Sequence, residues 1–236
     1  MSKESVVAYI LHTRPFKETS LLIDLFSREQ GRFSVLAKGV KRKSSQAQRA
    51  ILQSFNLLTI EYTGRSELKT LCHSELVCDS INLPHRALAC GYYINELLSR
   101  SLQEWQEFNQ LFQIYDDSIK ALHTSEDFAP ILRSFEVCLL DELGVAPQWD
   151  IDINNVQICA DSTYYFVPEQ GFELVSNIDK NNIDGMSSKT FTGEAILSLG
   201  NQSYNARTIK VCQQITQLLL RQIIGDKPLE SRKLWL

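Results

Sequence analysis

The spacing of the hydrophobic residues changes at Pro84, and this change constrains the fold more than any other feature of the sequence. Before Pro84, apolar side chains tend to recur at every second residue, which is the spacing of a half-buried strand. After Pro84, they recur at every third or fourth residue, which is the spacing of an amphipathic helix. We therefore expect an α+β protein, with a β domain first and a helical domain after it.

Five strand-like segments, separated by turn residues, fill the part before Pro84. They span residues 5–13, 19–27, 32–40, 52–63 and 67–79. A turn is expected at residues 28–31, where Gly31 can take the positive φ that a tight hairpin needs. The polar residues 41–48 have no apolar period and are expected to form a loop. Five short strands predict a small closed barrel, with the five-stranded OB-fold as first candidate and an SH3-like barrel as the main rival.

Four helices are expected after Pro84, at residues 86–103, 108–122, 128–143 and 205–224. Residues 145–189 differ from them because they are rich in Asp, Asn and Gly, with short strand-like pieces at 156–159 and 164–167. This segment is expected to be a small inserted subdomain that contains β structure. We therefore divide the chain into a barrel domain of residues 1–82 and a helical domain of residues 83–236, interrupted at about residues 145–189.

The formal net charge of −4 hides an uneven distribution along the chain. Residues 1–86 carry +5, residues 87–185 carry −13, and residues 186–236 carry +4. A mildly acidic total would argue against a nucleic-acid-binding protein only if the charge were spread evenly. The basic first domain and the acidic middle instead indicate that different surfaces meet different partners.

Sequence motifs of catalysis, metal binding and membrane insertion are missing. There is no nucleophile elbow, phosphate-binding loop, dinucleotide-binding motif or His-Glu-x-x-His zinc motif, so we expect no enzymatic activity. The six cysteines include no Cys-x-x-Cys pair, and we expect them to be reduced and mostly buried, with no metal or other cofactor. No apolar run approaches the ~20 residues that cross a bilayer, and the first residues do not resemble a secretory signal.

Basic residues of the first domain are the candidate DNA-binding residues, and aromatic residues lie between them in the sequence. A positive groove for the backbone and ring faces for the bases are what single-stranded nucleic acid requires. The alternative is that the aromatic rings fill the barrel core and the charges only keep the surface soluble. We favour the core for each aromatic ring and phosphate contact for residues 41–43. The basic residues are Arg14, Lys17, Arg32, Lys38, Lys41, Arg42, Lys43, Arg49, Arg65 and Lys69, and the aromatic residues are Phe16, Phe26, Phe55 and Tyr62.

Several short strings, taken in order, resemble the RecO family of bacterial recombination mediators, and they cover nearly the whole chain. No single string is diagnostic, but their order and spacing make the combination specific. They are Leu11-His12-Thr13-Arg14-Pro15, Glu18 to Leu22, Gly31-Arg32, Ala37 to Val40, Leu52-Gln53-Ser54-Phe55, Gly91 to Leu98, Leu132 to Glu136, Leu140 to Gly144, and Lys227 to Arg232.

The resemblance implies an N-terminal OB-fold, a helical domain and a small inserted subdomain. It also implies a role in DNA damage repair and recombination by the RecF pathway, in the setting of the SOS response. Members of the family bind single- and double-stranded DNA, anneal complementary strands and, with RecR, help RecA load onto coated DNA. A cytoplasmic protein, present at the nucleoid during repair, is therefore expected.

The resemblance also implies that the helical domain binds the acidic C-terminal tail of single-strand binding protein. Arg133 matches a basic position of the family's helical domain and is our candidate for this contact, because an arginine beside apolar walls suits a carboxylate-bearing tail. The alternative is a surface arginine that pairs with Glu136 or Asp141.

One departure from the family concerns zinc. Many members carry a four-cysteine zinc site in the inserted subdomain, whereas only Cys159 lies within residues 145–189 of this sequence. We expect a member of the branch without zinc, with an insertion held together by the packing of Tyr164, Tyr165, Phe166 and Phe172.

Two other classes of function stay open at the level of sequence. An OB-fold protein of this charge could bind RNA or assist translation, in which case it would prefer RNA to single-stranded DNA of equal length. A nucleic-acid hydrolase that uses unrecognised carboxylates is the second alternative, and it would cleave a labelled strand in the presence of magnesium.

Overall fold

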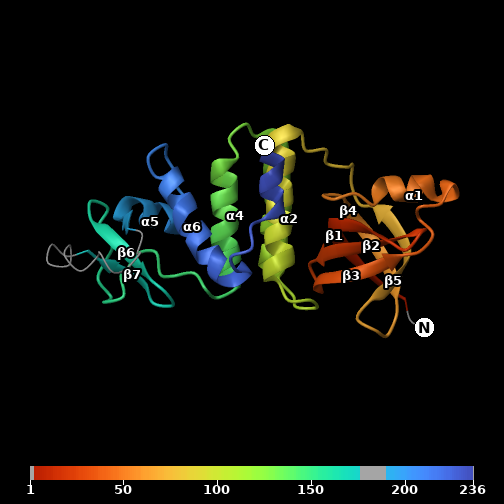
Figure 1. Ribbon diagram of the computed structural model, residues 1–236, viewed down its shortest axis with the longest axis horizontal. Helices are drawn as coiled ribbons and strands as arrows, with labels where there is room; N and C mark the ends of the chain where they lie inside the picture. Colours follow the sequence, from red (N-terminus) through yellow and green to blue (C-terminus); the bar gives the residue numbers. More distant parts are fainter. Residues whose placement is uncertain (1–2, 176–189, 236) are drawn as a thin grey trace. The chain divides into compact units, whose positions relative to one another are not determined.

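The computed structural model describes residues 3–175 and 190–235. The chain folds into two compact units. The first unit comprises Met1–Glu126 together with Lys227–Leu236, and the second comprises Asp127–Asp226. The structure has the α+β architecture that the sequence predicts, with a barrel first and then helices and a small sheet (Figure 1).

A closed five-stranded barrel forms the N-terminal part of the first unit. Its strands are β1 (Glu4–Phe16), β2 (Ser20–Ser27), β3 (Gly31–Ala37), β4 (Leu57–Thr63) and β5 (Lys69–Leu76). They follow the order β1-β2-β3-β5-β4, and β4 pairs with β1 to close the barrel. Neighbouring strands are antiparallel except β3 and β5. This is the OB-fold, so the first of the two predicted barrels is confirmed.

The barrel interior is filled by the inward-facing residues of each strand. Along β3, Phe33, Val35 and Ala37 are buried while the residues between them are partly exposed, which is the predicted alternation. Tyr62 of β4 packs against Phe33, with their ring centroids 5.3 Å apart. Burial of these side chains removes apolar surface from water and supplies most of the driving force for closing the barrel.

Residues 41–48 differ from the loop that the sequence predicts. A short 3-10 helix, η1 (Lys43–Ser45), leads into α1 (Gln46–Ile51). Within α1 only Ile51 packs against the barrel core, so the helix has no apolar stripe to reveal it. The strand predicted at residues 52–63 is shorter in the structure, where it begins at Leu57. The chain turns at Phe55, whose φ is +73°, before β4 starts.

The helices α2 (His85–Ser101) and α3 (Asn109–Thr124) belong to the first unit and cover the outer face of β1 and β2. Phe26 of β2 lies 5.6 Å from Phe112 of α3, measured between ring centroids. Tyr9 of β1 donates a hydrogen bond of 2.5 Å to Asp116. Burial raises the pKa of Tyr9, and the hydrogen bond to Asp116 raises it further. Because these contacts bury β1 residues on both faces, the barrel and these helices form one unit.

A buried polar chain also joins the barrel to the two helices. The Tyr115 hydroxyl donates to Oδ1 of Asn95 at 2.7 Å, and the Asn95 side-chain amide donates to the carbonyl of Leu11 at 2.8 Å. These bonds satisfy polar groups that would be costly to bury alone. The predicted division at residues 82 and 83 marks the change from strand to helix. The compact unit continues to Glu126, because α2 and α3 pack on β1.

The second unit combines helices with a three-stranded sheet. Its helices are α4 (Ala129–Glu142), α5 (Gly193–Gly200) and α6 (Ile209–Ile224), and its strands β6 (Thr163–Val167), β7 (Gly171–Leu174) and β8 (Thr190–Thr192) lie in the order β7-β6-β8. The predicted helices at 128–143 and 205–224 correspond to α4 and α6. No strand forms at 156–159, where Val156 is exposed and an isolated bridge joins Ile151 to Gln157.

Aromatic side chains hold the small sheet to its surroundings, as the sequence predicts for the insertion. Tyr164 and Phe172 are buried, and the rings of Phe166 and Phe172 meet edge to face at 5.6 Å. The Tyr165 hydroxyl donates to Glu173 on the neighbouring strand. The last part of the predicted insertion, residues 176–189, lies outside the described residues.

Candidate nucleic-acid interface

Two loops meet at one end of the barrel and bring several predicted DNA-binding residues together. The turn between β1 and β2 lies beside the segment that follows β3, because Phe16 pairs with Ser20 and Leu21 pairs with Ala37. The backbone N–H of Lys41 donates to the carbonyl of Thr19 at 3.0 Å, which fixes the two loops to each other. We call Arg14, Lys17, Lys38, Lys41 and Arg42 the basic tip.

The side chains of the basic tip are available to solvent. Arg14, Lys17, Lys38 and Arg42 are exposed, and Lys41 is partly exposed. Glu18 is the one acidic residue of the two loop segments, so the tip is strongly positive. Such a concentration of charge attracts a phosphate backbone and releases its counterions. The side chain of Lys43, which was predicted with this group, lies outside what the structure describes.

Of the four predicted aromatic residues, only Phe16 lies where a base could reach it. Phe16 is partly exposed at the end of β1, and the ammonium of Lys17 lies 5.6 Å from its ring centroid. Phe26, Phe55 and Tyr62 are buried, at 0%, 3% and 0% exposure. Of these three rings, only Tyr62 lies in the barrel core, whereas Phe26 packs against Phe112 of α3 and Phe55 against Tyr92 of α2.

Other predicted basic residues lie at the opposite end of the barrel and are held by contacts within the first unit. The Arg32 guanidinium donates to the carbonyl of Leu102 at 3.2 Å and forms an ion pair with Glu104 at 3.3 Å. The Lys69 ammonium donates to the carbonyl of Gly64 and lies 4.9 Å from the ring centroid of Trp105. Arg65 is exposed in the adjoining hairpin and Arg49 is exposed on α1, so the ten predicted residues do not form one continuous group.

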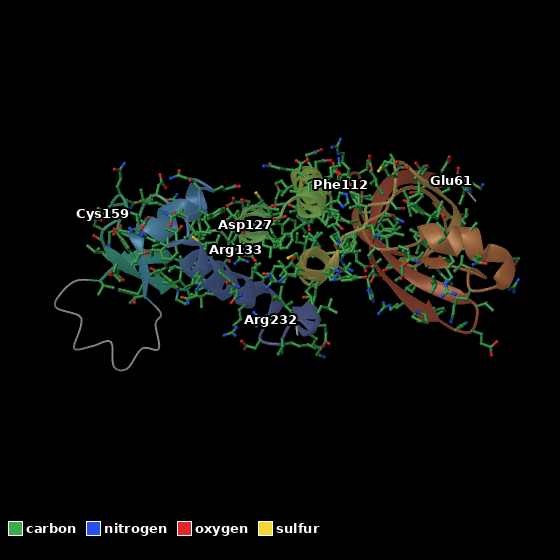
Figure 2. All side chains as sticks on the ribbon, turned by 90° about the horizontal axis from the view of Figure 1, so that it is seen from above. Glu61, Phe112, Asp127, Arg133, Cys159 and Arg232 are labelled. Atoms are coloured by element: carbon green, nitrogen blue, oxygen red, sulfur yellow. The ribbon has the colours of Figure 1, made fainter. Side chains whose placement is uncertain are left out.

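Arg133 lies in the interior of the second unit (Figure 2). Its side chain is 4% exposed and forms an ion pair of 2.5 Å with Glu136, which is itself fully buried. Of the two pairings considered for Arg133, the structure shows the one with Glu136, but in a buried position. Burial raises the pKa of Cys212 to about 11 and that of Tyr204 to about 12, and the Arg133 charge opposes both shifts.

A pocket that the sequence does not reveal lies within the first unit. It has a volume of about 590 Å³ and is bounded by β1, the segment before β4, α2 and the C-terminal turn η4 (Glu230–Trp235). Four of the strings that carry the family resemblance contribute to its lining, although they are far apart in the sequence. Its lining residues are Leu11, His12, Thr13, Asp24, Gln53, Ser54, Tyr92, Asn95, Glu96, Ser99, Glu230, Ser231 and Leu234.

The C-terminal wall of the pocket is fixed by Glu96 of α2. Its carboxylate accepts hydrogen bonds of 2.9 Å from the backbone N–H groups of Glu230 and Ser231. It also accepts a bond of 2.8 Å from the Ser231 hydroxyl. A carboxylate that binds the free N–H groups at the start of a helical turn is a favourable cap. Periodicity cannot predict this contact, because its partners are more than 130 residues apart.

Residues 3–175 and 190–235 contain neither a cluster of candidate metal ligands nor a helix that could span a membrane. No three His, Cys, Asp or Glu side chains in these ranges are grouped in a way that could hold a metal ion. No helix in them is both long and apolar enough to cross a membrane.

Comparison with known proteins gives matches over almost the whole chain. The family "Recombination protein O N terminal" matches residues 1–78, and "Recombination protein O C terminal" matches residues 85–233. The DNA repair protein RecO of Alteromonas mediterranea is 36% identical over all of this chain and 98% of its own length. DNA repair proteins RecO of Salmonella dublin and Pasteurella multocida are 37% and 36% identical, over 97% and 96% of this chain and 92% of their own lengths.

Proposed function

The chain belongs to the RecO family of DNA repair proteins, and from this premise we propose that it is a recombination mediator that binds DNA through the basic tip. The protein acts in DNA repair and recombination. Within that role, it binds single- and double-stranded DNA without sequence specificity and anneals complementary strands. The observation that carries this proposal is the exposed cluster of five basic side chains on two joined loops of an OB-fold barrel.

The chemistry of the tip suits backbone contact. Lysine and arginine side chains on turns can follow phosphates, and contacts to phosphate carry no sequence information. Phe16 offers a partly exposed ring beside Lys17, on which a base of any kind can stack. A strand held mainly by phosphates and stacking leaves the hydrogen-bonding edges of most bases free, and free edges are what pairing with a complementary strand requires.

The proposed partners follow from the family and extend the role beyond DNA. With RecR the protein helps load RecA onto DNA coated by single-strand binding protein, and the second unit binds the C-terminal tail of that protein. Arg133 is the proposed contact for the tail carboxylate, which must compete with Glu136 for the guanidinium. The protein works without catalysing a reaction, in the cytoplasm and at the nucleoid during repair.

Salt dependence of binding tests the DNA contact directly. The triple variant Lys38→Glu/Lys41→Glu/Arg42→Glu should bind a 20-nucleotide single strand more weakly than the wild type. Its plot of log affinity against log salt should be flatter by about 2, because each phosphate contact to a single strand contributes about 0.7 to the slope. Fluorescence anisotropy at several salt concentrations measures both quantities.

A matched control places the same charge change elsewhere. Arg207→Glu/Lys210→Glu/Arg221→Glu alters three exposed residues of the second unit and should leave the slope near that of the wild type. Equal slopes for the tip variant and the wild type would remove the tip from the DNA interface. A clear preference for RNA over DNA of equal length would favour the RNA-binding alternative, and magnesium-dependent loss of the labelled strand would favour a hydrolase.

A further inference from the structure

We propose that the pocket of about 590 Å³ in the first unit receives one base of the DNA strand that the basic tip holds. This inference rests on the proposed function, since it assumes that DNA binds the tip. The pocket would add recognition of one base to a surface whose other contacts are with the DNA backbone.

The pocket and the tip share strand β1. His12 lines the pocket and lies opposite Asp24 in the register of β1 and β2. The tip residue Arg14 is two residues further along β1, opposite Leu22. His12 and Arg14 therefore lie on the same side of the strand, about 7 Å apart at the rise of an antiparallel strand. A nucleotide whose phosphate contacts Arg14 can place its base beside His12.

The walls of the pocket suit a flat ring. Tyr92 of α2 is partly exposed at the pocket and is supported from behind by Phe55, with their ring centroids 5.2 Å apart. Leu11 and Leu234 add apolar surface to the lining. A supported aromatic ring gives a base a stacking partner that loses little freedom on binding.

Charge in the pocket excludes a phosphate and favours a base that carries an amino group. Asp24, Glu96 and Glu230 are among its lining residues, which include no lysine or arginine, so the lining disfavours an anion. Glu96 is occupied by the N–H groups of η4, whereas Asp24 accepts a hydrogen bond from Ser34 on Oδ1, at 2.6 Å. Among the interactions of the described residues, none reaches Oδ2 of Asp24, so this oxygen can accept a hydrogen bond from a base.

The identity of the base follows from this acceptor. Cytosine carries an N4 amino donor, whereas thymine presents the O4 acceptor at the same position. Oδ2 of Asp24 would attract the first and repel the second. A 20-nucleotide oligo-dC should therefore bind about fivefold more tightly than oligo-dT at equal salt, which is the size expected for one such hydrogen bond.

The decisive variant is Asp24→Asn. The amide oxygen can still accept the bond from Ser34, so the strand pairing is preserved, but an NH2 group replaces the free carboxylate oxygen. The fivefold preference for oligo-dC should disappear or invert, because the amide NH2 donates to thymine O4 and repels the cytosine N4 amino group. Asp79→Asn removes the same charge at an exposed position outside the pocket and should keep the difference.

A second variant tests the pocket by filling it. Ser99→Phe adds a ring from α2, and it should weaken binding of oligo-dC about tenfold while leaving binding of an abasic strand of equal length unchanged. Ser80→Phe adds a ring at an exposed site outside the lining and is the control. Circular dichroism and thermal unfolding establish that each variant is folded.

The outcomes separate this inference from the proposed function. Equal affinities of the wild type for oligo-dC and oligo-dT, or oligo-dC binding that Ser99→Phe does not change, would overturn the pocket's role even if the salt slope still assigns DNA to the tip. Absence of any DNA binding by the wild type would overturn both. A base preference that Asp24→Asn abolishes or inverts and Asp79→Asn keeps would support the pocket.

Discussion

Gly31 begins β3 with a φ of +64°, and the backbone at Gln106 lies so close to it that a side chain cannot fit. A β-carbon at this residue would lie 1.7 Å from the carbonyl oxygen of Gln106. Gly31→Ala should lower the free energy of unfolding by roughly 3 kcal/mol, because both the backbone angle and the contact would have to change. Urea unfolding followed by circular dichroism measures this loss.

Gly39 is the matched control for Gly31. Its φ of +73° is equally left-handed, but the nearest atom to a β-carbon there lies 3.8 Å away, in the side chain of Arg42. Gly39→Ala should therefore lose only about 1 kcal/mol, from the backbone angle alone. Similar losses for the two variants would show that the close contact at Gln106 does not matter for stability.

Glu136 provides a test of the contact proposed for Arg133. Glu136→Gln keeps an oxygen that can accept from the guanidinium but removes the competing negative charge. A peptide copying the acidic tail of single-strand binding protein should then bind about fivefold more tightly in a calorimetric titration. Glu142→Gln, on the same helix, is the control, and unchanged affinity of Glu136→Gln for the peptide would argue against Arg133 as the receptor.

Cys212 connects stability with alkaline pH. Burial raises the pKa of its thiol to about 11 from an ordinary value of 9.0, so the folded state holds the proton more tightly than the unfolded state. The resulting stability is fully present below pH 9 and is lost as the pH rises through 11. Raising the pH from 8 to 10.5 should therefore lower the free energy of unfolding by about 2 kcal/mol through this one thiol.

Comparison of variants isolates the part that Cys212 contributes. Over the same pH interval, the free energy of unfolding of Cys212→Ala should fall by about 2 kcal/mol less than that of the wild type. Urea unfolding at both pH values measures the two changes. Cys72→Ala removes an exposed thiol and should follow the wild type. If the Cys212→Ala and wild-type curves stay parallel, deprotonation of this thiol does not limit stability.

At the scale of the elements, strands with one buried face were predictable and short elements without such a face were not. The alternation of Phe33, Val35 and Ala37 identified β3, whereas α1 contributes only Ile51 to the core and gives no periodic signal. The basic tip was partly predictable, since its residues lie on two loops whose flanking strands pair. Neither the burial of Arg133 nor the separation of Arg32 and Lys69 from the tip could be foreseen, because partners such as Glu104 come from other segments.

The turn η4 depends on Glu96, and this dependence can be measured. Glu96→Ala removes the acceptor of the two backbone bonds and of the Ser231 hydroxyl bond. Amide hydrogens of residues 229–235 should exchange about tenfold faster, whereas those of β1 to β5 should keep their rates. Glu107→Ala changes an exposed acidic residue and serves as the control. Unchanged exchange in η4 would mean that packing, and not this cap, holds it.

At the scale of the molecule, the two compact units have separate cores. Phe135 of α4 is fully buried in the second unit, and Phe135→Ala should destabilise that unit by about 4 kcal/mol. Hydrogen exchange should accelerate in α4 and α6 but not in the barrel strands. The salt slope of DNA binding should stay unchanged as well. Acceleration throughout both units would show that they unfold as one.

The order of the two units along the chain has a consequence for synthesis on the ribosome. The barrel and its first helices emerge before any residue of the second unit, and domains generally fold as they emerge. Glu230 and Ser231, whose N–H groups Glu96 binds, leave the ribosome only after the second unit has been made. The nascent first unit therefore stays incomplete, with Glu96 lacking its partners and the pocket lacking one wall, until the second unit has been synthesised. A translational pause within residues 127–226 would prolong this unfinished state.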